Sequence, residues 1–236
     1  MPKLRHGRKH SSSADRSRKH RDRQTGAIRL ADQAPAERYN HTPIVYTSDS
    51  VPRNIAAMAR FATSSTVTVM STDNALGGRH VYLEHALTKR STFRAFQQSL
   101  AVLVRNTMSL PASTNVQWVV ETFPDGTQIM SSWVLRYDGV GGWHTDVAPV
   151  THTVRRTWTI CVALKANKSH FEISNRSTNR EGMRIWQYSD PVVIFQTHLL
   201  HRGNVAAGGS RIVLAAEFSL DQAMQDAIVQ RNKGQN

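Results

Sequence analysis

Three side chains in the second half of the chain could together bind a metal ion. His144 and Asp146 are separated by one residue, and His201 follows Asp146 after 55 residues. Residues two apart on a β-strand share a face, so His144 and Asp146 can reach one ion while Thr145 points away. Two imidazoles and one carboxylate on one face of an octahedral ion leave three positions open, as in non-haem iron(II) oxygenases. We therefore predict a metal site at His144, Asp146 and His201.

Arg211 is a candidate for binding an anion beside this site. It follows His201 by ten residues, across the turn residues 206–209. A buried guanidinium can hold a carboxylate with two parallel hydrogen bonds. A dicarboxylate that chelates the metal at one end needs a cation at its far end, and Arg211 could supply it. Taken alone, Arg211 would be interpreted as a surface arginine, because the chain has many.

The elements that must position these residues have the pattern of a mainly β domain. From residue 116 onward, short runs with β-type composition are separated by turn residues and by no helical pattern. Such a series is typical of antiparallel sheets in a sandwich, barrel or jelly roll. In a rolled sheet of this kind, strands distant in sequence become neighbours. The runs cover 116–122, 129–137, 157–164, 170–174, 183–188, 192–196, 198–205 and 211–218.

Helices are expected to flank this β region. Residues 53–62 have apolar residues at helical spacing, residues 65–71 alternate like a strand, and a further helix is predicted after Ser219 as its N-cap. The clearest helix covers 92–106. Its predicted buried stripe consists of Phe93, Phe96, Leu100, Leu103 and Val104.

Charge divides the chain into two parts. Of its 236 residues, 30 are Lys or Arg and 17 are acidic, a net charge of +13, and residues 1–30 alone contribute +8. We predict a disordered basic arm over 1–35 and a folded domain over 36–236. Residues 1–30 could attract nucleic acid, direct nuclear import or only solubilise the chain. Cys161 is the only cysteine, and no apolar run is long enough to span a bilayer. These features favour an intracellular protein, cytoplasmic or nuclear, with no membrane partner.

Two stretches resemble the motifs of a known superfamily. Residues 134–146 are similar to the first-ligand motif of the Fe(II)/2-oxoglutarate-dependent dioxygenases, and residues 190–218 to their second-ligand and co-substrate motif. The prolyl hydroxylase and phytanoyl-CoA hydroxylase branches are the most similar. The resemblance covers about 116–218 and implies a double-stranded β-helix, which is a distorted jelly roll.

The resemblance also implies an activity. Fe(II) would be held by His144, Asp146 and His201, and 2-oxoglutarate would chelate it, with Arg211 on its distal carboxylate and Tyr137 assisting. Reaction with O₂ would hydroxylate an unidentified substrate, a protein side chain or a small molecule, with release of succinate and CO₂. Alkylated-base demethylases of this superfamily usually have a second arginine where Glu217 stands, which argues against nucleobase demethylation.

Other interpretations of the same residues stay open. His152, His170 and His198 fit no ligand spacing, and we interpret them as structural or surface groups. A basic arm followed by a jelly roll is also the layout of many small viral coat proteins, in which the arm binds packaged nucleic acid. A cupin-like barrel without 2-oxoglutarate chemistry is a further alternative. The substrate and the oligomeric state cannot be inferred from the sequence.

Overall fold

The computed structural model describes residues 43–64, 79–87, 90–122, 125–137, 139, 141–146, 157–174 and 184–233. The predicted basic arm over 1–35 and the predicted strand over 65–71 lie outside these residues. None of the described helices is long and apolar enough to cross a membrane.

The elements agree with a mainly β chain flanked by helices. The helices are α2 (Arg53–Ser64), α3 (Leu83–Ala86), α4 (Arg90–Thr107) and α5 (Gln222–Lys233). The strands are β1 (Val45–Ser48), β2 (Arg79–Tyr82), β3 (Gln117–Trp118), β4 (Val120–Thr122), β5 (Gln128–Met130), β6 (Ser132–Tyr137), β7 (Thr157–Ser174), β8 (Ile185–Tyr188), β9 (Val192–Gln196) and β10 (His201–Ser219).

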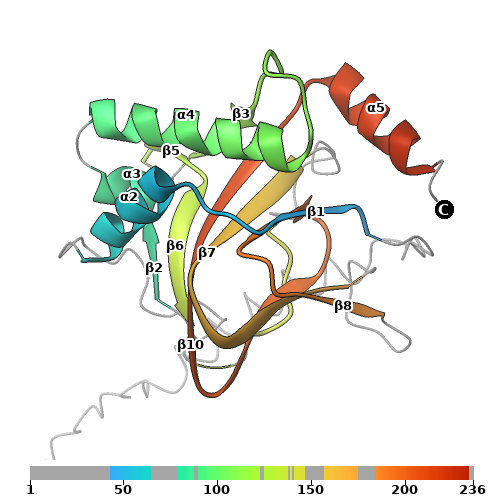
Figure 1. The fold of residues 1–236 in the computed structure, drawn as a ribbon. Coiled ribbons are helices and arrows are strands. Elements are labelled where there is room, and N and C mark those ends of the chain that lie inside the picture. The colour runs from blue at the N-terminus through green and yellow to red at the C-terminus, as the bar shows by residue number, and fades with distance from the viewer. Residues whose placement is uncertain are drawn as a thin grey trace, which may run out of the picture. The chain divides into compact units, whose positions relative to one another are not determined.

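Two long strands, β7 and β10, are the central pair of the fold. They pair antiparallel along nearly their whole lengths, and the register is interrupted between Val205 and Ser210. At the interruption Lys168 has a φ of 48° and Gly208 a φ of 71°, values that bend the chain out of regular strand geometry. Figure 1 shows both strands curving strongly along their length. The β7–β10 pair is therefore divided into two halves, and each half belongs to a different part of the sheet.

The pairings of the two halves define a double-stranded β-helix. The second half of β10 lies between β6 and the first half of β7, which in turn pairs with β9. The first half of β10 pairs with the second half of β7, whose other neighbour is β8. On its free side the first half of β10 forms a bridge from His201 to His144. The larger layer is completed by β1, which pairs with β9, and by β2, which pairs with β6. Two layers of unequal size thus share the same two long strands, and the predicted distorted jelly roll is confirmed.

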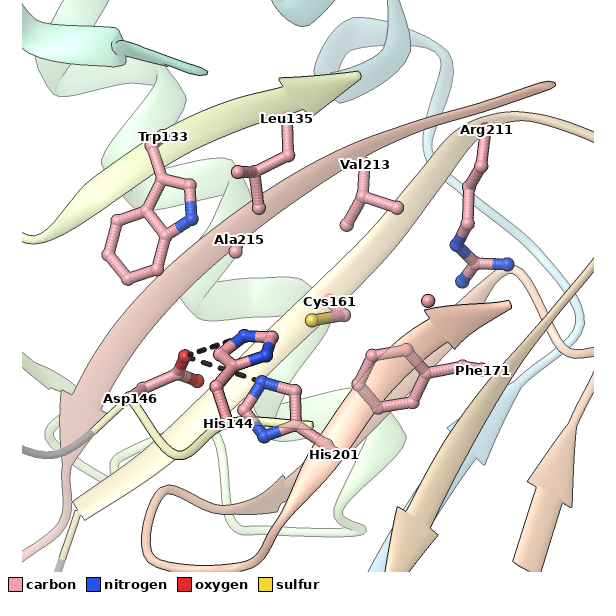
Figure 2. Close-up of a pocket in the computed structure, with 11 residues that line it drawn as sticks. Trp133, Leu135, His144, Asp146, Cys161, Phe171, His201, Arg211, Val213 and Ala215 are labelled. Carbon is pink, nitrogen blue, oxygen red and sulfur yellow. Dashed lines mark ion pairs between the residues drawn. The ribbon is translucent and has the colours of Figure 1, made fainter. Parts of the chain in front are cut away.

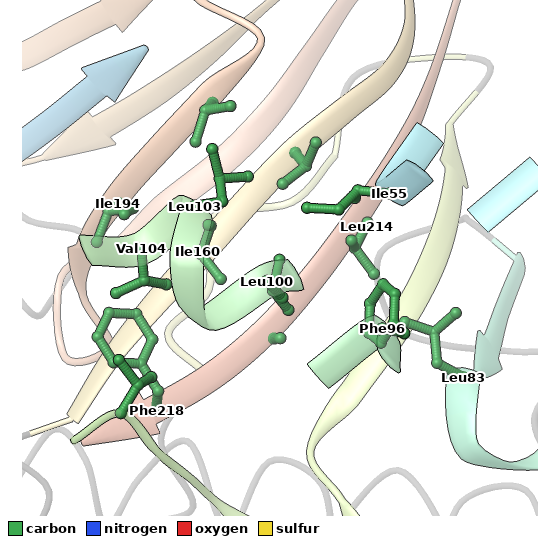
Figure 3. Close-up of a cluster of buried hydrophobic side chains, with 14 of the residues drawn as sticks. Ile55, Leu83, Phe96, Leu100, Leu103, Val104, Ile160, Ile194, Leu214 and Phe218 are labelled. Atoms are coloured by element: carbon green, nitrogen blue, oxygen red, sulfur yellow. The ribbon is translucent and has the colours of Figure 1, made fainter. Parts of the chain in front are cut away.

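Helices cover the outer face of the larger layer. The predicted stripe on α4 is buried as expected, and it packs with α2 residues such as Ile55 and with the outward side chains of β7, β9 and β10. Figure 3 shows Leu100, Leu103 and Val104 of α4 facing Ile160 and Ile194 across this core. This apolar cluster packs the helices against the outer face of the sheet. The side chains on the inner face are not part of it.

Alternation along β10 separates the two faces. Leu214, Ala216 and Phe218 belong to the cluster under the helices. Val213 and Ala215 belong to a second, interior cluster. Side chains at odd positions of this strand, starting with Arg211, therefore point into the barrel.

Some predicted boundaries were wrong. The runs 157–164 and 170–174 are one strand, β7, because the chain stays extended through its polar segment 165–169. The runs 198–205 and 211–218 are likewise one strand, β10, which begins only at His201. The predicted turn 206–209 is therefore an irregularity within β10, and Arg211 lies on the same strand as His201. Asp221, not Ser219, caps α5, since its Oδ1 accepts a 2.8 Å hydrogen bond from Met224 N. Strands β1 and β2 were not predicted.

Candidate metal centre and co-substrate pocket

The three predicted metal ligands converge inside the barrel. His144 and Asp146 lie two residues apart in the segment 141–146, and His201 begins β10. His201 Nε2 is 3.3 Å from Asp146 Oδ1, and His144 Nε2 is 3.7 Å from the same oxygen. One donor atom from each residue lies within 4.8 Å of the others. The described part of the chain holds no other group of His, Cys, Asp and Glu side chains that meets this criterion.

Backbone hydrogen bonds hold the two ligand strands together. His144 N donates to His201 O at 3.1 Å, and His201 N donates to His144 O at 2.9 Å. Asp146 N also donates to Thr197 O at 3.3 Å. Such a reciprocal pair places the two residues directly opposite each other, with side chains on the same face. The ring centroids of His144 and His201 are accordingly only 4.2 Å apart.

The second nitrogen of each imidazole is occupied by a backbone carbonyl. His144 Nδ1 is 2.9 Å from Gly142 O, and His201 Nδ1 is 3.1 Å from Leu199 O. A carbonyl can only accept, so each Nδ1 must carry the proton and donate it. Each Nε2 then presents a lone pair toward the centre of the triad. Metal-binding histidines are oriented in this way by a partner on the other ring nitrogen.

Asp146 is prepared as an ionised ligand. Thr159 Oγ1 donates to Asp146 Oδ2 at 2.8 Å, so Oδ1 is the oxygen that faces the imidazoles. Burial would raise the pKa of this carboxyl, but His201 and His144 together with the Thr159 hydroxyl lower it on balance. Burial, with a smaller effect of His201, lowers the pKa of His144 to about 4. At neutral pH the pair therefore offers a neutral imidazole and a carboxylate, the forms that bind metal.

Arg211 shares a pocket with the triad. The wall of one cavity holds both the triad and Arg211. Arg211 is only 2% exposed, and its guanidinium carbon lies 5.8 Å from the centre of the Phe171 ring. Figure 2 shows Arg211 at one end of the pocket and the triad at the other, with Cys161 between them. A buried arginine and the three candidate ligands thus line one pocket.

Two further predicted residues lie at the same pocket or next to it. Tyr137 is the register partner of Arg211 on β6, so its backbone is adjacent to the pocket, while its side chain lies outside the described residues. Cys161 was predicted to be a small core residue, and it is buried, but it also lines the pocket wall. Burial raises the pKa of its thiol, which keeps it protonated.

Several pocket residues were not found from the sequence. Trp133 and Leu135 of β6 form the wall above the triad, and Phe171 of β7 packs against His201 with ring centroids 5.5 Å apart. Thr159, which orients Asp146, was also missed. The only signal for them was inward alternation on strands whose pairing was unknown, and alternation alone does not say which strand faces which.

The histidines set aside in the sequence are not brought to the triad. His170 Nε2 lies 2.8 Å from Glu172 Oε1 on the outer side of β7. His198 is half-buried in the turn before β10. His152 lies outside the described residues.

Comparisons with known proteins give matches among solved structures alone. No family model and no curated protein matches the sequence. The non-heme alpha-ketoglutarate-dependent epimerase SnoN from nogalamycin biosynthesis is 12% identical, with 83% of this chain and 81% of that chain covered and a TM-score of 0.48. HygX from Streptomyces hygroscopicus, with nickel and 2-oxoglutarate bound, is 10% identical over 82% and 86%, with a TM-score of 0.46.

A Pseudomonas putida prolyl-4-hydroxylase is 11% identical, with 82% of this chain and 98% of that chain covered and a TM-score of 0.43. All three likenesses are of overall arrangement, at TM-scores below 0.5. These likenesses therefore do not assign an activity to this chain, and the activity has to be inferred from its own residues.

Proposed function

We propose that this chain is an Fe(II)- and 2-oxoglutarate-dependent oxygenase that hydroxylates a protein side chain or a small molecule. One observation carries the proposal. A buried arginine and three pre-oriented metal donors, two imidazoles and one carboxylate, share a single pocket inside a double-stranded β-helix. Metal binding alone would explain the donors but not the buried cation across the pocket.

The donor set suits iron(II). His144, Asp146 and His201 would hold the ion through Nε2, Oδ1 and Nε2, the atoms left over once their other polar atoms are hydrogen-bonded. Two neutral imidazoles and one carboxylate leave open positions on the ion, which is the arrangement expected of non-haem iron oxygenases. His144 is the most exposed of the three side chains at 21%, against 7% for Asp146 and 4% for His201. Access to the ion is therefore from the His144 side.

Arg211 would hold the co-substrate. A guanidinium buried on the inner face of β10 favours a carboxylate partner, because such a partner offsets its desolvation. The Phe171 ring packs near it and narrows the directions from which an anion can approach. The Cys161 thiol between Arg211 and the triad is small and neutral, so it adds no charge that would repel a dicarboxylate bound to both.

When bound, iron(II) and 2-oxoglutarate supply the activation of O₂, with release of succinate and CO₂. The chain itself contributes orientation and a dry surrounding for that chemistry. Apolar side chains of Trp133, Leu135 and Val213 line the pocket beside the polar groups. Asp146 completes the ligand set, which favours oxygen transfer over halogenation, since related halogenases lack that carboxylate.

The coat-protein alternative gains no support from the described residues. Burying Arg211, Asp146 and His201 inside a barrel costs solvation free energy, and a shell subunit has no need to do so. As part of the proposal, residues 1–30 attract nucleic acid or direct nuclear import, and the chain acts in the cytoplasm or nucleus. These two points rest on charge alone.

Conversion of 2-oxoglutarate to succinate without added substrate tests the proposal. The purified chain is supplied with Fe(II), 2-oxoglutarate and air, and succinate is measured by mass spectrometry. We expect slow succinate formation by the wild type and none by His201→Ala. His198→Ala, which removes a histidine three residues away, is the matched control and should keep the wild-type rate. Equal succinate formation by the wild type and His201→Ala would refute the proposal.

A further inference from the structure

The segment that carries His144 and Asp146 is attached to the barrel by few backbone contacts. Within the described residues, it makes a single bridge to β10 instead of a continuous ladder. The hydrogen bonds of this segment to the β10 side are those of His144 with His201, Gly141 N to Gly203 O at 2.9 Å, and Asp146 N to Thr197 O at 3.3 Å. These four backbone hydrogen bonds set the register of the segment, and side-chain contacts can add to them.

Side chains on the outer face supply such a contact. Trp143 immediately precedes His144, and Arg202 immediately follows His201. Because neighbours on a strand point to opposite faces, Trp143 and Arg202 face outward where the two ligands face inward. The guanidinium carbon of Arg202 lies 4.6 Å from the centre of the Trp143 ring. This is the geometry of a cation–π contact, and it joins the two ligand-bearing segments from outside.

Arg202 is itself held in place by a buried carboxylate. Its Nε donates to Glu172 Oε2 at 2.6 Å, and the two residues are register partners on β10 and β7. Glu172 is 3% exposed, and its Oε1 also accepts hydrogen bonds from Asn204 Nδ2 at 2.9 Å and His170 Nε2 at 2.8 Å. Although burial opposes ionisation, these donors lower the pKa of Glu172 to about 2. Glu172 thus anchors the guanidinium plane against which Trp143 stacks.

We propose that Trp143, Arg202 and Glu172 form an outer clamp that positions the metal ligands on the other face of the same strands. The inference rests on the proposed metal site. Trp143 and Arg202 are positioning residues, since neither points into the pocket. Loss of the clamp should loosen the segment of His144 and Asp146 and weaken metal binding, while every ligand stays in the chain.

A purely structural role predicts a different result. If the clamp only stabilised the sheet, its loss would lower the melting temperature in proportion to any loss of metal binding. If it positions ligands, metal affinity should fall while the thermal stability of the metal-free protein changes little. Removing a group that hydrogen-bonds a metal ligand typically weakens metal binding by about 10- to 100-fold. The clamp acts through the backbone instead, so we expect the lower end, about 10-fold, for Trp143→Ala.

Cobalt(II) titration of the full chain tests this, with thermal melting of the metal-free protein in parallel. Trp143→Ala should bind cobalt(II) about 10-fold more weakly, and Trp143→Phe, which keeps an aromatic face for Arg202, should recover most of the affinity. Arg231→Ala is the matched control. It removes an arginine that lies 5.7 Å from the Tyr46 ring, and it should bind cobalt(II) like the wild type.

Two failures can be told apart. If the wild type binds no cobalt(II), or His201→Ala binds it equally well, the proposed metal site is wrong and the clamp with it. If the wild type and Trp143→Ala bind equally well while His201→Ala does not, the metal site stands and the clamp is overturned. Should Trp143→Ala not fold, Arg202→Met must show the same loss of affinity, and wild-type affinity in that variant also overturns the clamp.

Discussion

Glu217 should make the stability of this protein fall between acid and mildly alkaline pH. It lies on the inner face of β10 and is 9% exposed. Ser131 Oγ is 2.8 Å from Glu217 Oε2 and also 2.8 Å from Glu121 Oε1. A hydroxyl has one proton to donate, so two ionised carboxylates cannot both be satisfied there. Burial, with the nearby charges of Asp146 and Glu121, raises the pKa of Glu217 to about 8, which identifies it as the protonated partner.

The size and sign of the effect follow from this pKa. A rise from 4.5 to about 8 corresponds to roughly 4–5 kcal/mol of differential stability at about 1.36 kcal/mol per pKa unit. Below pH 4.5 the folded and unfolded states both hold the proton, and the contribution of Glu217 to stability is fully present. Between pH 4.5 and 8 only the unfolded state releases the proton, so stability is lost as pH rises. Above pH 8 both states are ionised and the loss is complete.

Glu217→Gln removes this titration and keeps the side-chain volume and an N–H donor for Ser131. Urea denaturation of the metal-free protein at pH 4.5 and pH 8.5 measures it. Relative to the wild type, the variant should gain several kcal/mol of unfolding free energy on going from the lower to the higher pH. Asp226→Asn, an exposed acid-to-amide change on α5, should show no such gain. Parallel pH profiles for the wild type and Glu217→Gln would refute the assignment of the proton to Glu217.

Three further predictions concern the pocket and the core. Arg211→Gln should weaken 2-oxoglutarate binding by more than about 30-fold, since truncating a buried ion pair costs 2 kcal/mol or more, while iron(II) still binds; calorimetric titration of the iron-loaded protein with 2-oxoglutarate measures this, and unchanged affinity would exclude Arg211 from the site. Gly209→Ala should lower the melting temperature, because an added Cβ would lie 2.6 Å from Asn167 O at the bend of the ribbon, and an unchanged melting curve would contradict that crowding. Leu100→Ala should lower the unfolding free energy in urea by about 2–5 kcal/mol, because Leu100 is fully buried. Val102→Ala on the same helix should lower the unfolding free energy far less, because Val102 is 47% exposed.

The parts of the fold that carry strong periodicity could be predicted from the sequence. The stripe on α4 is buried as expected, and β9 has the predicted limits of Val192 and Gln196. The continuity of β7 could not be predicted. Its middle, Lys165–Ser169, has the polar composition of a loop, but the ribbon it forms with β10 holds it extended through the bend. Long-range pairing thus overrides the local signal.

For the candidate site, too, the sequence indicated the residue types but not the groups that orient them. His144, Asp146 and His201 were predicted as ligands from their types, their spacing and the resemblance to a ligand motif, and the structure brings them together. The groups that orient them could not be predicted. Gly142 O and Leu199 O are backbone atoms with no signature in the sequence, and Thr159 is an ordinary strand residue until its pairing is known. Likewise, nothing in the sequence indicated that Arg211 is buried, because the chain has 30 Lys and Arg residues in all.

Anaerobic titration of the metal-free chain with Fe(II), followed by 2-oxoglutarate, tests the proposed centre most directly. We expect one iron per chain, and a weak visible charge-transfer band that develops only after 2-oxoglutarate is added. Asp146→Ala should give neither the stoichiometric iron nor the band. A wild-type chain that binds no iron, or an Asp146→Ala chain that gives the same band, would contradict the assignment of His144, Asp146 and His201 as an iron site.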